Sequence, residues 1–284
     1  MSTVLFDTPG PRTQARHRIY STAAWLLLVL AIAGFVWRMQ TEGELTYAKW
    51  EPLITPVFVK ALLLDGVLNT VKMAVFAVVF ALIIGLVLGV GKLSDRSWVR
   101  WPSWVVVEFF RAVPLLLLII FIYFTYGVGD GIGSFWSVVI GLTLYNGSVL
   151  AEVFRAGVNA VPAGQAEAAY AIGMRKTQVM TLVLLPQAVK IMLPAIISQM
   201  VVALKDTSLG YYILAPGLTT VGRQIYGEFK NQFQVALVMA ALYIGLNLIL
   251  TFLATKVQHR LVGEKTPLVL ADGDVGNVQS GRAL

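Results

Sequence analysis

The sequence VNAVPAGQAEAAYAIGMRKTQVMTLVLLPQAVKIMLP, residues 158–194, lies between strongly apolar segments and keeps a helical pattern of its own. Pro162 suits a helix start, where the missing N–H has no cost, and Gly173 suits the left-handed residue that closes a helix. Glu167 falls in the first turn, where a carboxylate complements the positive end of the helix. These residues predict one helix of about three turns.

The residues that follow predict a second helix. Arg175 and Lys176 come after the stop, and Thr177 is a suitable cap for a helix that runs to Leu185. Pro186 is expected to break this helix, because proline lacks the N–H of an inner helical residue. The segment is therefore expected to form a helix, a sharp turn and a second helix. On this pattern alone, a docking element and an ordinary cytoplasmic loop with a surface helix are equal alternatives.

Several short strings in a fixed order resemble a known family. The string EAA at 167–169, with Gly173 beyond it and LP at 185–186, resembles the EAA loop of permease subunits of ABC importers. The strings GQAEAAYAIGM, LLPQAVKIMLP, LKDTSL and EFFRAVPLLLLIIFIYF are similar to the polar amino acid uptake branch, the glutamate, glutamine, histidine and arginine type. The resemblance covers roughly residues 65–260.

The resemblance implies partners for this chain. In that family the loop forms short coupling helices that fit a cleft on a cytoplasmic ATPase. The partners implied are a second permease subunit (a paralogue or a second copy), two ATP-binding cassette ATPase subunits and an extracytoplasmic substrate-binding protein. The residues expected to couple to the ATPase are Gln165, Glu167, Ala168, Ala169, Gly173 and Arg175.

The composition is that of an integral membrane protein. Hydrophobic residues make up 57% of the 284 residues and charged residues only 13%, whereas a globular domain carries about a quarter charged residues. With no cysteine and two histidines, disulfides and His/Cys metal sites are excluded. The net charge of +7 is spread among loops beside apolar spans, which the positive-inside bias explains better than nucleic-acid binding.

The apolar runs predict an all-α integral membrane protein with six transmembrane helices and both termini in the cytoplasm. Placing the basic clusters inside requires an even number of spans. We expect a multi-pass protein of the bacterial cell membrane. The expected spans are Thr22–Met39, Leu63–Val90, Val105–Tyr126, Phe135–Phe154, Gln187–Leu204 and Val235–Thr255.

The chain is expected to divide into four parts. Residues 1–21 form a basic cytoplasmic arm, and 22–61 form an extra N-terminal transmembrane helix with an external connector. Residues 62–260 form the permease transmembrane domain, with the coupling loop at about 158–186, and 261–284 form a flexible cytoplasmic tail. The triplet Ala31-Ile32-Ala33 imitates a signal-peptide cleavage site, but it lies inside the apolar run, so we expect an uncleaved helix.

No catalytic residue, cofactor or metal site is expected in this chain. The string GVGKLS at 89–94 faintly imitates the end of a phosphate-binding loop, but it closes an apolar helix rather than following a strand. Hydrolysis must then come from a partner, so that ATP and Mg²⁺ lie on the ATPase.

A transported amino acid needs a cation for its carboxylate and an acceptor for its ammonium group. Two lysines near the expected cavity favour an acidic substrate such as glutamate. Each polar residue also has a structural interpretation: Asn146 and Tyr145 as hydrogen bonds between helices, Lys72 as a side chain that reaches the interface, and Lys205 with Asp206 as an exposed helix end. The pathway candidates are Asn69, Lys72, Tyr145, Asn146, Ser148, Lys205, Asp206, Thr207 and Ser208.

Two pairs of opposite charges recur near the cytoplasmic ends of spans. Glu108 with Arg111, and Glu152 with Arg155, are each three residues apart, a spacing that allows an ion pair on one helix face. We expect both pairs to be structural and to hold the inner gate region in register.

Three function classes remain. An ATP-driven amino acid importer subunit is preferred. A secondary transporter or channel would want carboxylates buried in the middle of the spans, and the sequence has almost none. A non-transporting membrane scaffold would co-purify with neither an ATPase nor a binding protein.

Overall fold

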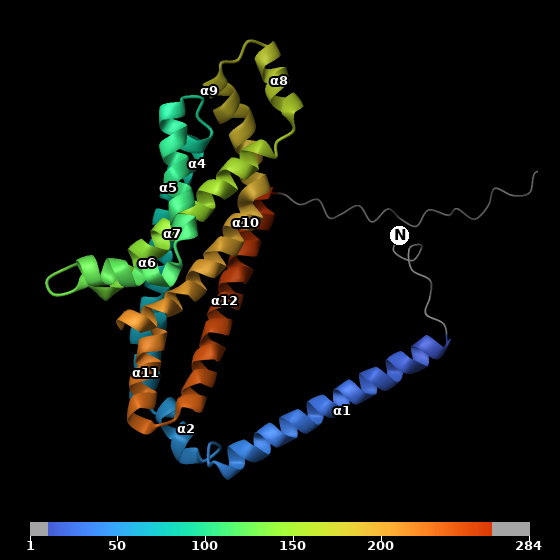
Figure 1. Ribbon diagram of the computed structural model, residues 1–284, viewed down its shortest axis with the longest axis vertical. Coiled ribbons are helices and arrows are strands. Elements are labelled where there is room, and N and C mark those ends of the chain that lie inside the picture. Colours follow the sequence, from blue (N-terminus) through green and yellow to red (C-terminus); the bar gives the residue numbers. More distant parts are fainter. Residues whose placement is uncertain (1–10, 263–284) are drawn as a thin grey trace, which may run out of the picture. The chain divides into compact units, whose positions relative to one another are not determined.

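A computed structural model describes residues Pro11–Val262, and the regular structure in that range is entirely helical (Figure 1). Residues 1–10 of the predicted arm and residues 263–284 of the predicted tail lie outside the described range, so both chain ends do as well. The described residues form two units. One contains the chain up to Val59 together with Arg223–Val238, and the other contains Lys60–Gly222 together with the chain from Met239.

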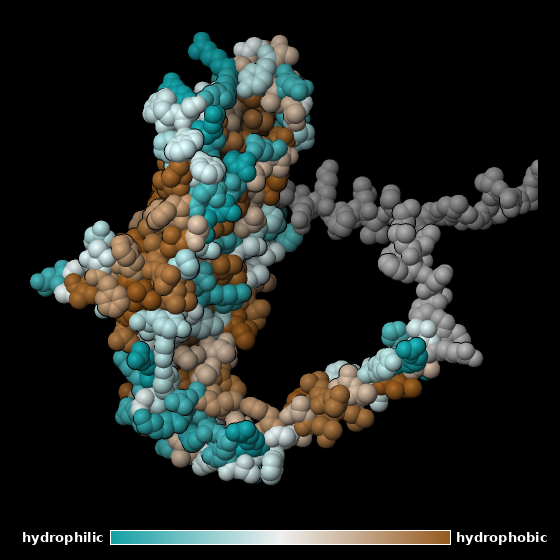
Figure 2. All heavy atoms as spheres, in the orientation of Figure 1, coloured by the Kyte–Doolittle hydropathy of each residue, from teal (hydrophilic) through white to brown (hydrophobic). Residues whose placement is uncertain are grey.

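The first unit is dominated by the long helix α1 (Pro11–Thr41). Helix α1 already begins at Pro11, so the described part of the predicted arm is not separate from the span but continues it. The apolar side chains in its middle are exposed, and Figure 2 shows them as a hydrophobic stretch of α1. Such exposure is the expected state of a helix that faces lipid. The prediction of an N-terminal spanning helix therefore agrees with its length and composition.

The connector after α1 is helical and packed rather than extended. It contains α2 (Tyr47–Ile54) and α3 (Pro56–Lys60). The Asn231 side chain donates a hydrogen bond of 2.9 Å to the carbonyl oxygen of Lys49, and Glu44 accepts hydrogen bonds from Lys49 and Gln234. Hydrogen bonds to the carboxylate, from Lys49 first, hold the pKa of Glu44 below its usual value. These bonds fix the start of α2 against the chain around residue 231.

The second unit is built on the pair α4 (Leu68–Lys92) and α7 (Gly133–Asn159). A π-helical turn, Ala61–Val67, precedes α4 without interrupting the helix. Glycines bring the two helices close together. A Cβ atom on Gly85 would lie 2.7 Å from the Leu150 Cβ, and one on Gly89 would lie 2.9 Å from the Phe154 Cβ. Close approach of this kind is how helices associate in a membrane, where apolar contact alone gives no preference for a partner helix.

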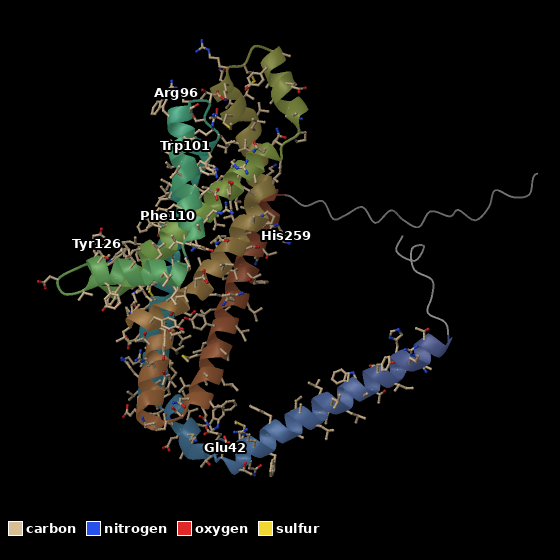
Figure 3. All side chains as sticks on the ribbon, in the orientation of Figure 1. Glu42, Arg96, Trp101, Phe110, Tyr126 and His259 are labelled. Carbon is tan, nitrogen blue, oxygen red and sulfur yellow. The ribbon has the colours of Figure 1, made fainter. Side chains whose placement is uncertain are left out.

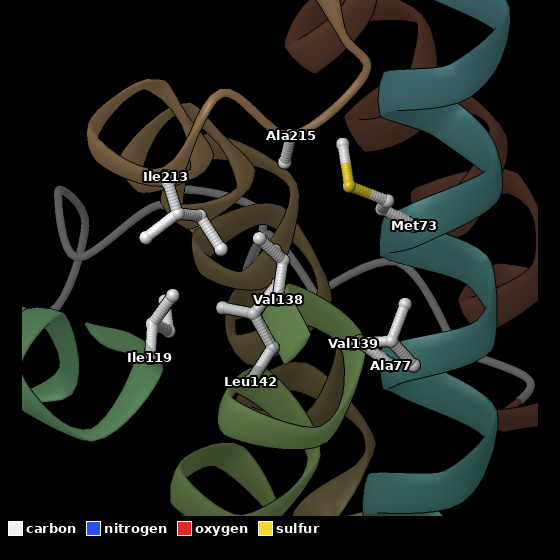
Figure 4. Packing of buried hydrophobic residues seen from close by; sticks show 8 residues of the cluster. All are labelled: Met73, Ala77, Ile119, Val138, Val139, Leu142, Ile213 and Ala215. Carbon is white, nitrogen blue, oxygen red and sulfur yellow. The ribbon is translucent and has the colours of Figure 1, made fainter. Parts of the chain in front are cut away.

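The core of this unit joins α4 and α7 to two shorter segments (Figure 4). Ile119 comes from α6 (Leu115–Ile122) and Ile213 from a 3₁₀ turn at Thr207–Ile213. The cluster is small and tightly buried. Its members are Met73, Ala77, Ile119, Val138, Val139, Leu142, Ile213 and Ala215.

The third predicted span is not straight. Helix α5 (Ser97–Ala112) and the segment Leu115–Gly127 meet at an angle of 99°. The bend lies at Val113, which is extended with ψ 127°, and at Pro114. A residue before proline is driven away from the helical region, and the proline itself supplies no N–H. The predicted span from Val105 to Tyr126 therefore consists of two helices joined at a sharp bend.

Pro186 has the opposite effect from the one predicted. The helix continues through it from Lys176 to Ile213, a run of 38 residues. A π-helical turn at Val179–Leu184 precedes α10 (Leu185–Asp206), and Pro186 lies in the first turn of α10. The wider π turn accommodates the ring and the missing N–H in front of the proline. Thr177 is not the cap, since the cap residue is Arg175.

The remaining elements agree better with the sequence. The segment predicted to be too broken for a span contains only the 3₁₀ turn and α11 (Leu218–Phe229), and α12 (Gln232–Val262) includes the last predicted span. Within Pro11–Val262, five helices are long and apolar enough to cross a membrane, or six if the bent pair of α5 and α6 is one span.

We expect Gly85→Val to destabilise the second unit. The added carbons must displace the Leu150 side chain or the backbone at Gly147, which overpacks the contact between α4 and α7 at a cost of about 1–3 kcal/mol. The measurement is unfolding in detergent. Gly245→Val is the matched control, because no heavy atom lies within 4 Å of a Cβ at that position. Equal stability of the two variants would contradict the close packing.

Candidate functional site

The predicted coupling helix is present as α8 (Ala163–Ala171). It follows Pro162, as expected, and ends at a left-handed Gly173 with φ +83°. The N–H of Gly173 donates to the carbonyl oxygen of Tyr170, and the N–H of Met174 donates to that of Ala169, which closes the helix. A side chain at residue 173 would be strained in this conformation, so the glycine is required by the backbone.

Helix α8 presents one face to solvent and rests on the other. Gln165, Glu167 and Ala168 are exposed, as is Ile172, whose side chain is 79% exposed. Ala169 is buried and seats the helix on the protein. Ile172 is an exposed large apolar residue at the end of α8, and the sequence interpretation did not select it. The predicted coupling residues thus divide into an exposed group and one residue that anchors the helix.

The segment after α8 is anchored by hydrogen bonds to its own chain and to α10. The backbone N–H of Arg175 donates to the Gln178 side chain at 2.9 Å. The Gln187 side chain donates to the Gln165 Oε1 at 3.3 Å, which links α10 to α8. The turn and its two helices therefore hold a defined shape, as the helix–turn–helix prediction required.

An ion pair ties this loop to the turn between α4 and α5. The Lys176 ammonium group hydrogen-bonds the Asp95 carboxylate, 81 residues away in the sequence. This bond holds the pKa of Asp95 below its usual value. A lowered carboxyl pKa means that the contact is present at neutral pH and weakens as the pH falls through that lowered value. The two segments border a cleft of about 530 Å³, whose floor includes Val90, Phe154 and Met180.

The two predicted ion pairs belong to one larger network. Glu108 pairs with Arg111 at 3.3 Å, and Glu152 pairs with Arg155 at 2.9 Å. The ammonium group of Lys92 lies between the pairs, 3.3 Å from Glu108 and 3.1 Å from Glu152. The Lys92 side chain is only 4% exposed. The network therefore joins α4, α5 and α7, and its central residue was read from the sequence only as a basic residue of a loop.

Two of the predicted pathway residues make hydrogen bonds within or between helices. Asn146 donates to the Leu142 carbonyl oxygen at 2.8 Å, and its Oδ1 accepts a 2.5 Å hydrogen bond from Gln199. This bond between α7 and α10 is the helix-to-helix interpretation left open above. Ser148 is buried and donates to the Leu144 carbonyl oxygen of its own helix.

A different set of polar side chains borders a cleft on α10 and α12. Lys205 and Ser208 line it together with Tyr243 and Asn247, and its volume is about 530 Å³. The Asn247 Nδ2 donates to the Tyr243 carbonyl oxygen, while its buried Oδ1 has no hydrogen-bond partner among residues 11–262. Asn247 and Tyr243 were not selected from the sequence, because they lie inside an apolar run like any other polar residue of a span.

The other predicted pathway residues are not brought to this cleft. Lys72 is exposed on α4, and Asn69 donates to the Asp65 carbonyl oxygen of its own helix. Thr207 is buried and donates to the Leu204 carbonyl oxygen. Tyr145 and Asp206 are half-buried. Of the predicted pathway residues, only Lys205 and Ser208 line this cleft.

Comparison with known proteins assigns the chain to a family. Residues 77–263 match the model of the binding-protein-dependent transport system inner membrane component. The chain belongs to this family. The match covers the α4–α7 pair, the α8 loop, α10 and α12, so both the anchored loop and the cleft fall within it.

Individual relatives agree with this assignment. The glutamate transport system permease protein GluD of Corynebacterium glutamicum is 43% identical over 78% of this chain and 82% of its own. The arginine transport system permease protein ArtQ of Bacillus subtilis is 32% identical over 70% of this chain and 92% of its own. A crystal structure of an amino acid ABC transporter with histidines superposes with a TM-score of 0.66 at 28% identity, over 72% of this chain and 96% of that one.

The family assignment separates the three function classes. A binding-protein-dependent inner membrane component is a transport subunit of the cell membrane, so the chain is a multi-pass membrane permease rather than a secondary transporter or a scaffold. The match begins at residue 77, so α1 and the connector after it precede the part that the family model describes. The N-terminal helix was predicted to be additional to the permease domain.

We expect Lys92→Met to destabilise this permease by about 2 kcal/mol. This loss of unfolding free energy is smaller than the ~3–5 kcal/mol expected when one partner of a fully buried ion pair is removed, because Glu108 and Glu152 keep some access to water. Unfolding in detergent measures the loss. Adding Glu152→Gln should cost less in the Lys92→Met background than in the wild type, since the Glu152 carboxylate has then already lost one of its two cationic partners and keeps only Arg155.

The matched comparison is the exposed pair of Arg38 on α1 and Glu42 directly after it. Arg38→Met removes the same kind of ion pair in water, where such pairs contribute roughly 0–1 kcal/mol. If Lys92→Met lowered the free energy of unfolding no more than Arg38→Met, the ion-pair network of α4, α5 and α7 would not stabilise the protein.

Proposed function

We propose that this chain is the permease subunit of an ATP-driven importer of glutamate, and that α8 is the handle by which an ATPase moves it. The observation that carries the proposal is the state of α8 itself. It is an exposed helix, closed by a glycine that no other residue replaces without strain, on a loop tied to the rest of the protein at several points.

The ATPase is proposed as a separate chain with its own ATP and Mg²⁺. The family name states dependence on a binding protein, which supports an extracytoplasmic substrate-binding partner. The resemblance of the EAA loop supports two ATPase subunits and a second permease subunit. In this assembly the loop and the clustered basic side chains lie on the cytoplasmic side, in agreement with the positive-inside bias.

Three contacts provide a route by which movement of α8 reaches the spans. Buried Val158 and Val161 at the end of α7 pack in one cluster with Ala188 and Met192 of α10. The hydrogen bond of Gln187 to Gln165 links α8 to the start of α10. The ion pair of Lys176 with Asp95 links the loop to α4 and α5. A displacement of α8 would therefore act on four helices at once.

We expect Gly173→Ala to uncouple the ATPase from transport. A Cβ at φ +83° costs roughly 1–2 kcal/mol, which shifts the end of α8 away from its closed form. In proteoliposomes that contain the assembled transporter, ATP hydrolysis stimulated by the substrate-loaded binding protein should fall at least about fivefold. Insertion of the permease into the membrane should be unchanged.

Gly227→Ala provides the control, because Gly227 has an ordinary φ and a Cβ atom there would meet no heavy atom within 4 Å. Normal stimulated hydrolysis in Gly173→Ala would show that the mechanical joint lies elsewhere in the chain.

Glutamate is proposed as the substrate on two grounds. The relative GluD, at 43% identity, is a glutamate transport permease, whereas the arginine permease ArtQ is at 32%. The α10–α12 cleft offers the Lys205 ammonium group for a carboxylate and the Asn247 Oδ1 as an acceptor for an ammonium group. A zwitterion with an additional carboxylate suits a cleft whose only charged lining residue within 11–262 is a lysine.

We expect Lys205→Met to slow glutamate uptake about tenfold, since a hydrogen bond to a charged group contributes roughly 1.5–3 kcal/mol. The measurement is the initial uptake rate at a saturating level of substrate-loaded binding protein. Lys190→Met is the control, because Lys190 is exposed on the same helix and does not line the cleft. A panel of competing amino acids in which arginine or histidine inhibited uptake better than glutamate would overturn the substrate assignment.

A further inference from the structure

We propose that the permease binds the anionic headgroup of a phospholipid in a basic cleft between the end of α4, the start of α5 and the end of α7. The cleft has a volume of about 540 Å³ and is separate from the cleft on α10 and α12. It is lined by Lys92, Arg100, Trp101, Trp104, Glu152 and Arg155.

The charges at this cleft do not cancel. Lys92 and Arg155 share the carboxylate of Glu152, and Glu108 is shared by Lys92 and Arg111. Among the residues that line the cleft, three cations therefore face one carboxylate: the cations are Lys92, Arg100 and Arg155, and the carboxylate is Glu152. Asp95 also lies close enough to act on Arg100, but it is already paired with Lys176. The cleft as a whole keeps a positive charge.

Two arginines have donors to offer an anion. Arg100 donates one hydrogen bond, at 3.2 Å, to the neutral carbonyl oxygen of Ser94. Arg155 bonds Glu152 through its Nε, and its two terminal nitrogen atoms make no hydrogen bond with any residue between 11 and 262. A guanidinium group matches a phosphate geometrically, because its parallel N–H groups meet two oxygen atoms at once.

The aromatic residues place this cleft at the membrane boundary. Trp101 is 69% exposed and Trp104 is 50% exposed, which is costly in water but favourable at the headgroup level of a bilayer. Figure 3 shows Arg96, Trp101 and Phe110 in sequence along α5. The exposed side chains of Val105 and Phe109 continue the apolar surface beyond the tryptophans.

This arrangement fits a lipid better than a free anion. A phosphate held by Arg100 and Arg155 would leave its attached acyl chains beside Val105 and Phe109, which need an apolar neighbour. An inorganic phosphate would occupy only the polar part of the cleft and leave Trp101 and Trp104 uncovered. Basic clefts between spanning helices on the cytoplasmic side are suited to lipid headgroups in this way.

The experiment uses the full-length chain purified in detergent and native mass spectrometry. Phosphatidylglycerol is titrated as the anionic lipid and phosphatidylcholine as the neutral one. We expect phosphatidylglycerol to bind more tightly, and Arg100→Gln to weaken it roughly fivefold, the factor for one basic residue near a lipid surface. Arg100→Lys keeps the charge and should retain most of the affinity.

Arg96→Gln is the matched control. Arg96 lies one turn before Arg100 on the same exposed end of α5 but does not line the cleft, and its guanidinium group contacts Trp98 instead. The proposal is overturned if Arg96→Gln weakens binding as much as Arg100→Gln, which would indicate general attraction to the basic surface. It is also overturned if millimolar inorganic phosphate displaces phosphatidylglycerol, or if the two lipids bind equally.

Should Arg100→Gln disturb the fold, Trp101→Leu provides a second variant that leaves every charge in place. An exposed tryptophan is not needed for packing, so circular dichroism and elution volume should be unchanged. A lipid site predicts weaker retention of phosphatidylglycerol in this variant, whereas a site for a free anion predicts no change.

Discussion

The contact between α4 and α7 is the constraint on which the rest of the second unit depends. Within a bilayer, apolar side chains gain nothing by leaving lipid for another helix, so association needs close packing and polar contacts. Gly85 and Gly89 supply the close packing against Leu150 and Phe154. The same closeness lets Lys92, at the end of α4, reach the carboxylate of Glu152 on α7. A wider separation of the helices would remove one of the two carboxylates that pair with this buried ammonium group, and an incompletely paired buried charge is costly.

This contact also determines how the coupling loop is held. Helix α7 leads directly into the loop. Val158 near its end and Val161 just after it pack with α10 on the other side of the loop. The loop therefore starts and ends on helices that already touch each other. Its remaining freedom is limited by the ion pair of Lys176 with Asp95, which attaches it to α4 as well. An exposed helix on such a base can transmit force, whereas the same helix on a slack loop would only move by itself.

The sequence was sufficient where the deciding interaction is local. Apolar runs located the spans, Pro162 and Gly173 located α8, and the spacing of three residues predicted the pairs of Glu108 with Arg111 and Glu152 with Arg155. It was insufficient where a residue meets a distant one. Three contacts join residues that are 60, 81 and 53 positions apart, so no spacing rule connects them. They are Lys92 with Glu152, Lys176 with Asp95, and Gln199 with Asn146.

The two prolines show that the sequence also does not decide how a proline is accommodated. Pro114 follows an extended Val113, and the chain bends there by 99°. The π turn before Pro186 instead lets the helix continue. The local sequence shows only that a proline is present. Whether the chain bends at the proline or the helix continues through it depends on the packing around it.

The two asparagines of the long spans show where a transport pathway is to be sought. Asn146 lies in an apolar setting and was the natural candidate, yet both ends of its amide are bonded, to Leu142 and to Gln199. Its hydrogen-bonding capacity is largely used in joining α7 to α10. Asn247 has the same side chain, but its buried Oδ1 has no partner within residues 11–262 and it borders the cleft that contains Lys205. A buried amide oxygen without a donor is costly unless a ligand or water completes it. This energetic argument is the reason why we propose the cleft between α10 and α12, rather than the surroundings of Asn146, as the place where the substrate binds.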